Sequence, residues 1–226
     1  MIKVENINIW GYEHAIRGMR NPKNSWEKSD SGYEFDRIED GREVFTYIIG
    51  PNDMKLMQTL FKGGTEHRKY LRQIFISMDI TAPLYWWKEF DTYKVGTVSN
   101  SCSTMHKIAA KKFELDDFSH EHLLASSKNT LYAVINELNY WRDIYLDEDN
   151  VVDKCVPSLK KEYWWQMIQL LPSSYNQRRT ITMNYENVFT ILRQRRGHKL
   201  DEWNNLCDIF ETFPYVKEIG GLDAER

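Results

Sequence analysis

The spacing of apolar residues changes along this chain, from alternation in the first third to helical spacing in the remainder. Apolar and polar residues alternate over residues 1–10, with a slip near Asn6, and residues 43–49 form a short apolar run that stops at Gly50-Pro51. Residues 70–78 alternate again and are rich in β-branched and aromatic side chains, which favour strands. The first third of the chain therefore predicts three strands.

Helical spacing and helix-breaking residues define most of the remaining chain. We predict helices over residues 53–61, 81–95, 104–112, 121–146, 158–170, 174–195 and 201–213. Residues 20–40 are rich in Asn, Pro, Ser, Gly and charge, which predicts a long loop. No linker divides the chain, so we expect one domain over residues 1–226. The expected fold class is α+β, with a small, mostly antiparallel sheet from the N-terminal third packed with long helices.

Charge and cysteine usage limit the partners of the protein. The chain carries 30 basic and 33 acidic side chains, for a net charge of −3. This balance provides no basic field for nucleic acid, so we expect no specific nucleic-acid partner and only a local anion site. Cys102, Cys155 and Cys207 form no CxxC pair, which indicates a reducing compartment. No apolar stretch approaches the ~20 residues of a membrane span, so we expect a cytoplasmic protein without a membrane partner.

The familiar motifs of nucleotide, hydrolase and metalloprotease sites are absent from the sequence. His120 and His122 flank Glu121, but a spacing of two residues points the two imidazoles to different faces of a helix. The sequence therefore predicts no metal site.

Two polar segments in the first half of the chain are candidates for a site. Glu66-His67 follows a double glycine, where the pair either orients a cofactor ring or phosphate or is simply exposed at a strand entry. Residues 99–104 place hydroxyl and amide groups around one thiol. Such groups suit a phosphate or a pyrimidine edge, and they equally suit a helix cap.

Two basic segments are the remaining candidates. Residues 193–199 carry three arginines, a histidine and a lysine at a predicted helix end. They form either an anion clamp or the complement of the helix dipole. Arg17, Arg20 and Lys23 lie in the early part of the chain, where they add to such a clamp or remain solvated.

The order of these features resembles the flavin-dependent thymidylate synthases, also known as thymidylate synthase-complementing proteins. The matching segments are Ala15-Ile16-Arg17, Gly63-Gly64-Thr65-Glu66-His67, the predicted strand at 70–78, the predicted helix from Thr81, residues 100–106, and Arg196 with Glu202-Trp203. Asn100 and Ser103 keep the Asn and the second Ser of the family motif RHRxxSxNxxSxRY, and His106 stands at its tyrosine.

The resemblance implies reductive methylation of dUMP to dTMP. In that reaction FAD carries hydride from NADPH, and methylenetetrahydrofolate gives the carbon. The resemblance places Ser103 in a catalytic role beside the nucleotide. It assigns cofactor binding to His67, Lys94 and Asn100, and substrate binding to Arg17, Ser103 and Arg196. It also implies a homotetramer with sites between subunits.

The chain departs from the family at the arginines. Among the residues at the RHR triplet only Lys94 is basic, and Met105 stands where the arginine after the second serine is expected. Loss of such charge-assisted hydrogen bonds costs about 1.5–3 kcal/mol each. This departure leaves open a second hypothesis, a non-catalytic relative that keeps the fold as an oligomeric nucleotide-binding or scaffold module. A third hypothesis is an aromatic-rich interaction protein unrelated to nucleotides.

Overall fold

The computed structural model describes residues 2–147 and 157–221. The chain forms two compact units that alternate along the sequence. Unit 1 comprises Met1–Lys3, Ile80–Thr92 and Asn100–Thr180, and unit 2 comprises Val4–Asp79, Tyr93–Ser99 and Ile181–Arg226. The prediction of a single domain stays a prediction.

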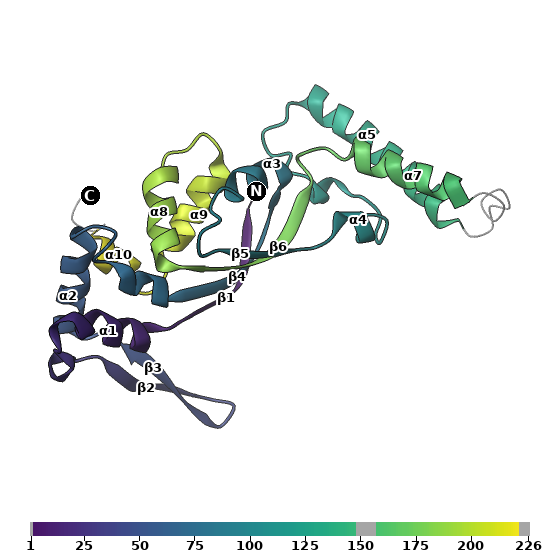
Figure 1. Ribbon diagram of the computed structural model, residues 1–226. Helices are drawn as coiled ribbons and strands as arrows, with labels where there is room; N and C mark the ends of the chain where they lie inside the picture. Colours follow the sequence, from purple (N-terminus) through teal and green to yellow (C-terminus); the bar gives the residue numbers. More distant parts are fainter. Residues whose placement is uncertain (1, 148–156, 222–226) are drawn as a thin grey trace. The chain divides into compact units, whose positions relative to one another are not determined.

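A four-stranded sheet has the strand order β1-β4-β6-β5 (Figure 1). Its strands are β1 (Lys3–Trp10), β4 (Phe75–Pro83), β6 (Asn176–Asn184) and β5 (Val98–Ser101). The predicted strand at 1–10 is confirmed by β1, and the slip in its alternation has a backbone cause, because Asn6 adopts φ 53°. Of the four strands, β1 lies in the N-terminal third of the chain, β4 begins at its end, and β5 and β6 come from further along.

A separate hairpin pairs β2 (Gly32–Glu39) with β3 (Arg42–Ile48) in antiparallel register, from Gly32↔Ile48 to Glu39↔Arg42. The prediction of a strand at 43–49 is confirmed, but the prediction of a loop through 20–40 is wrong for β2. Asp40 and Gly41 form the turn, and both have positive φ, as a two-residue hairpin turn requires. Most side chains of β2 are exposed, and charged residues stand between its apolar ones, so this segment lacks the apolar content by which a buried strand is recognised.

Unit 1 contains a pair of long antiparallel helices over a core of aliphatic and aromatic side chains. Helix α5 (Ala125–Leu146) packs against α7 (Pro157–Leu170), as Figure 1 shows. Helices α3 (Leu84–Phe90) and α4 (Thr104–Lys107) are short. The predicted helix at 81–95 is shorter than expected because β4 continues through Pro83, which becomes the N-cap of α3.

Unit 2 gathers the remaining helices: α1 (Tyr12–Arg20), α2 (Pro51–Lys62), α8 (Tyr185–Arg195), α9 (Asp201–Glu211) and α10 (Val216–Gly220). The short 3₁₀ helix η3 (Lys69–Gln73) precedes β4, so the strand predicted from residue 70 begins five residues later. The buried side chains of Ile74, Ile76 and Met78 form the core face of this segment.

The prediction of one helix over 174–195 is wrong for its first half. Residues 176–184 form β6, in which Ile181 and Met183 are buried and Thr182 between them is half-buried. Asn184 then ends the strand and begins α8, because its side-chain oxygen accepts a hydrogen bond from the Asn187 amide at 3.2 Å. A strand that runs directly into a capped helix offers no proline or glycine as a boundary.

Within the described residues, none of the helices is long and apolar enough to cross a membrane.

Candidate functional site

The Glu66-His67 pair lies in the turn after α2. Gly64 has φ 103°, and its carbonyl accepts hydrogen bonds from the amides of His67 and Arg68 at 3.1 and 3.2 Å. A side chain at Gly63 would meet the His67 ring at 3.2 Å. The double glycine therefore ends α2 and leaves room for the imidazole, which is exposed.

His67 lines a pocket of about 270 Å³ together with Lys23 and Lys69. Its lining also includes the apolar side chains of Leu56 and Leu60 of α2. Glu66 is the carboxylate of this lining, so the basic side chains outnumber it. Two features that the sequence left separate, Lys23 and Glu66-His67, thus meet at one cavity whose donors suit an anion. Sequence reasoning missed Lys69, although it stands two residues after His67.

Arg17 and Arg20 occupy different environments on α1. Arg20 is 4% exposed and belongs to the protein interior, where its Nε lies 2.5 Å from Asp53 Oδ1. Arg17 is exposed and lines a pocket of about 370 Å³ with Glu13 and Trp26. Among the described residues no carboxylate lies within ion-pair distance of Arg17, so its guanidinium is available to an anion. Arg20 is neither part of an exposed clamp nor solvated.

The residues that match the family motif fall in both units. Lys94 is exposed in unit 2, whereas Asn100 is exposed on β5 and belongs to unit 1. Ser103, also in unit 1, is the N-cap of α4 and accepts a hydrogen bond from the His106 amide at 3.2 Å. Capping uses the hydroxyl only as an acceptor, so its proton can still be donated.

An arginine lies beside the position of the degraded RHR triplet. Tyr93 accepts a hydrogen bond from Arg195 Nε at 2.9 Å, and the guanidinium of Arg195 lies 4.6 Å from the ring centroid of Trp203. Sequence reasoning noted the basic run at 193–199 but missed this contact, because a pattern along one helix does not say which loop packs against it.

Arg196 is held by carboxylates. It lines a pocket of about 330 Å³ with Arg68, Arg193 and the rings of Phe61 and Phe189. Its guanidinium donates to Asp208 Oδ1 at 2.5 Å and to Glu211. Any anion at this pocket competes with those two carboxylates for Arg196.

Three of the predicted residues of unit 2 therefore line three different pockets: His67 one, Arg17 a second and Arg196 a third.

The fold has known counterparts. No protein-family model matches this chain, and no curated protein is significantly similar to it in sequence. The crystal structure of the flavin-dependent thymidylate synthase ThyX from Helicobacter pylori, complexed with FAD and dUMP, is similar with a TM-score of 0.62 and 17% identity over 96% of both chains. A second structure of ThyX from Helicobacter pylori with FAD and dUMP has a TM-score of 0.60 and 16% identity, also over 96% of both chains. The expected α+β fold of this family is confirmed, and at these identities the similarity shows the fold alone.

Proposed function

We propose that this chain is a divergent flavin-dependent thymidylate synthase that binds FAD and converts dUMP to dTMP. The observation that carries the proposal is the fold, which matches ThyX bound to FAD and dUMP over 96% of both chains. The motif residues Asn100 and Ser103 add support, because the Asn100 side chain is exposed and the Ser103 hydroxyl, which accepts a hydrogen bond from the His106 amide, can still donate its proton.

The residues present fit the chemistry of FAD. A flavin dinucleotide needs cationic donors for its pyrophosphate and hydrogen bonds for its ring edges. The pocket at His67 offers an imidazole and the ammonium groups of Lys23 and Lys69, and Asn100 presents an exposed amide. When bound, FAD supplies the hydride transfer from NADPH that the methylenetetrahydrofolate-dependent reaction requires.

In this proposal the chain binds and orients the reactants. Arg17 contributes its exposed guanidinium to the nucleotide phosphate, and Ser103 donates its hydroxyl proton to the nucleotide. Lys94 supplies the one basic side chain that remains at the RHR triplet, and Arg196 completes the nucleotide site only if the anion displaces a carboxylate. Because the pockets of unit 2 are separate, we further propose that complete sites require a homotetramer.

One observation favours the alternative of a non-catalytic relative. The arginine that matches the late family arginine, Arg196, is already paired with Asp208 and Glu211. Together with the missing triplet arginines, this pairing lowers the positive charge available to a nucleotide phosphate. A scaffold that keeps the fold needs no such charge.

An assay of dTMP formation by the purified protein distinguishes the active synthase from the non-catalytic relative. We expect dTMP to form from dUMP when FAD, NADPH and methylenetetrahydrofolate are all supplied. Ser103→Asn keeps a helix N-cap but removes the hydroxyl, so it should leave the fold intact and weaken dUMP binding about tenfold or more. Ser103→Thr, which keeps both the cap and the hydroxyl, is the matched control. Absence of dTMP with all four components present would favour the non-catalytic alternative.

A further inference from the structure

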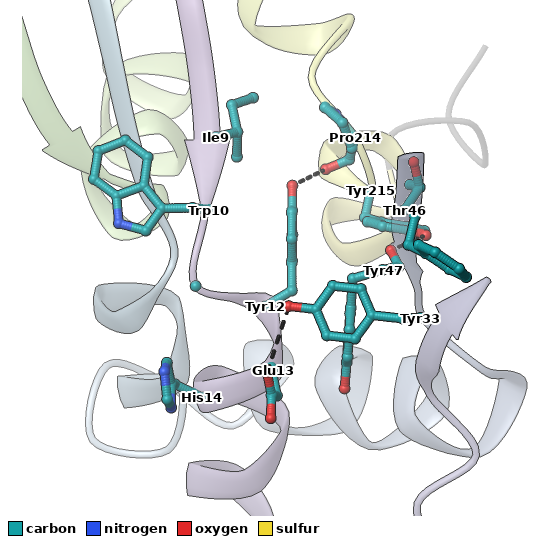
Figure 2. A pocket seen from close by; sticks show the side chains of 12 residues that line it. Ile9, Trp10, Tyr12, Glu13, His14, Tyr33, Thr46, Tyr47, Pro214 and Tyr215 are labelled. Atoms are coloured by element: carbon teal, nitrogen blue, oxygen red, sulfur yellow. Dashed lines mark hydrogen bonds between the residues drawn. The ribbon is translucent and has the colours of Figure 1, made fainter. Parts of the chain in front are cut away.

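A cavity lined by aromatic side chains lies in unit 2, apart from the residues assigned to flavin or nucleotide. Its volume is about 530 Å³, within the range of small-molecule sites. The first turn of α1, the β2–β3 hairpin and the segment before α10 supply its walls. Figure 2 shows Tyr33 from the hairpin reaching toward Tyr12 and Glu13 of α1, and His14 also belongs to the lining.

The rings of this cavity meet nearly at right angles. Tyr33 and Tyr47 have centroids 5.1 Å apart and an interplanar angle of 78°. Tyr12 and Tyr215 have centroids 5.6 Å apart and an angle of 81°. Perpendicular walls suit a rounded ligand group, whereas a flat group stacks best on one face or between parallel rings.

Two of the hydroxyl groups are already engaged in the protein. Tyr12 Oη lies 2.7 Å from Tyr185 Oη, and Tyr215 Oη accepts a hydrogen bond from the Ile49 amide at 3.1 Å. Burial raises the pKa of Tyr12 well above its ordinary value, so its hydroxyl stays neutral. These two rings therefore offer apolar and π surface rather than free polar groups.

Glu13 is the one carboxylate among the residues that line the cavity. Glu13 is exposed, and Tyr33 Oη donates to it over a long 3.5 Å. Among the described residues no Lys or Arg lies within ion-pair distance of Glu13, and the lining contains His14 but no Lys or Arg. Arg17 lies one turn further along α1 and lines an adjacent pocket, which shares Glu13 and Tyr47 with this cavity. A carboxylate beside several aromatic rings attracts a cation.

We propose that this cavity binds a small alkylammonium cation, held by the aromatic rings of Tyr33 and Tyr47 and by the carboxylate of Glu13. Methylated ammonium groups are rounded and weakly hydrated, so they match perpendicular aromatic walls better than a planar guanidinium does. The lining also offers one carboxylate rather than the set of fixed acceptors that a guanidinium fork uses. The site goes beyond the proposed synthase activity and depends on neither FAD nor dUMP.

Calorimetric titration of the full chain with choline tests this proposal, without FAD or dUMP present. The matched probe is 3,3-dimethyl-1-butanol, which has the shape of choline without its charge. We expect choline to bind and the neutral alcohol to bind at least about tenfold more weakly. Equal affinity for both probes, or no choline binding at millimolar concentration, would overturn the proposal. Tighter binding of methylguanidinium than of choline would overturn the alkylammonium assignment.

Substitutions of the residues that line the cavity test whether choline binds there. Glu13→Gln and Tyr33→Leu should each weaken choline binding about fivefold or more, because each removes one attraction to the cation. Tyr33 is 62% exposed, so its replacement should leave the fold intact, which circular dichroism checks. Tyr33→Phe keeps the ring and should retain the affinity within about twofold. Choline binding that is unchanged in both Glu13→Gln and Tyr33→Leu would place it elsewhere and refute the assignment.

Discussion

Replacement of Asp53 by asparagine is expected to destabilise the folded protein by about 3–5 kcal/mol, because the change leaves the charge of Arg20 buried without its partner. The side chain of Asp53 has 0% exposure and that of Arg20 5%. One carboxylate oxygen accepts from Arg20, and the other accepts from the hydroxyls of Ser29 and Ser31 at 2.7 Å. This network ties the segment after α1 to the first turn of α2. Urea denaturation followed by circular dichroism measures the loss.

Asp36→Asn is the matched control. Asp36 forms an ion pair with Arg37 on the exposed hairpin, where the two side chains are 40% and 55% exposed. Its loss should change the free energy of unfolding by less than about 0.5 kcal/mol. Equal effects of the two substitutions would mean that burial does not govern the strength of the Asp53 network.

The Asp53 carboxylate also makes the free energy of unfolding depend on pH in the acid range. Burial alone raises the pKa of Asp53, but hydrogen bonds from two serine hydroxyls, Arg20 and a backbone amide outweigh it and hold the pKa below its usual value. The stabilisation is therefore complete above the ordinary carboxyl pKa of about 4 and is lost as the pH falls through the lower folded value. Asp53→Asn should lack this part of the acid dependence.

Replacement of Trp87 by alanine is expected to cost about 3–5 kcal/mol of stability in unit 1. The indole is 1% exposed, its Nε1 donates to the Gln177 carbonyl at 2.9 Å, and the Arg179 guanidinium lies 4.2 Å from its ring centroid. Alanine removes the packing and leaves the carbonyl without its donor. Chemical denaturation checks the value. If the alanine variant does not fold, Trp87→Phe is measured instead. It keeps most of the ring and should lose about 1–3 kcal/mol of stability.

The chain contains an internal control for this prediction. The triplet Tyr-Trp-Trp occurs at 85–87 and again at 163–165, on α3 and on α7. The last tryptophan of the second copy, Trp165, is 41% exposed. Trp165→Ala should cost less than about 1 kcal/mol. A comparable loss at both positions would contradict the burial on which the Trp87 prediction depends.

Sequence patterns predicted the elements that carry their own local signals. The strand at the N-terminus, the helix after Gly50-Pro51 and the helix ending at Leu146 all have periodicity or breakers at their boundaries. The strand β6 was mistaken for a helix because Asn184 both ends the strand and caps α8 without a break in the chain. The strand β2 was mistaken for a loop because turn-forming and charged residues precede it and an irregularity between Phe35 and Arg37 breaks the alternation.

Part of the candidate site was predictable because it also carries local sequence signals. The double glycine at 63–64 indicates the turn that exposes His67, and the motif spacing indicates Asn100 and Ser103. The partners of these residues come from distant segments, such as Lys23 beside His67 and the carboxylates Asp208 and Glu211 around Arg196. A pattern along one segment records no contact with another, so the pairing of Arg196 and the aromatic cavity at Tyr33 became visible only in three dimensions.

The fold is proposed to retain a site for FAD and dUMP despite its missing arginines. Thermal denaturation of the purified protein with FAD and dUMP, separately and together, tests this proposal. A ligand that binds only the native state adds about 2.7 kcal/mol of stability at 100 times its dissociation constant, which raises the melting temperature by a few degrees. We predict a rise with FAD that increases further when dUMP is added. No rise with either ligand, in a protein that is folded, would contradict the proposal.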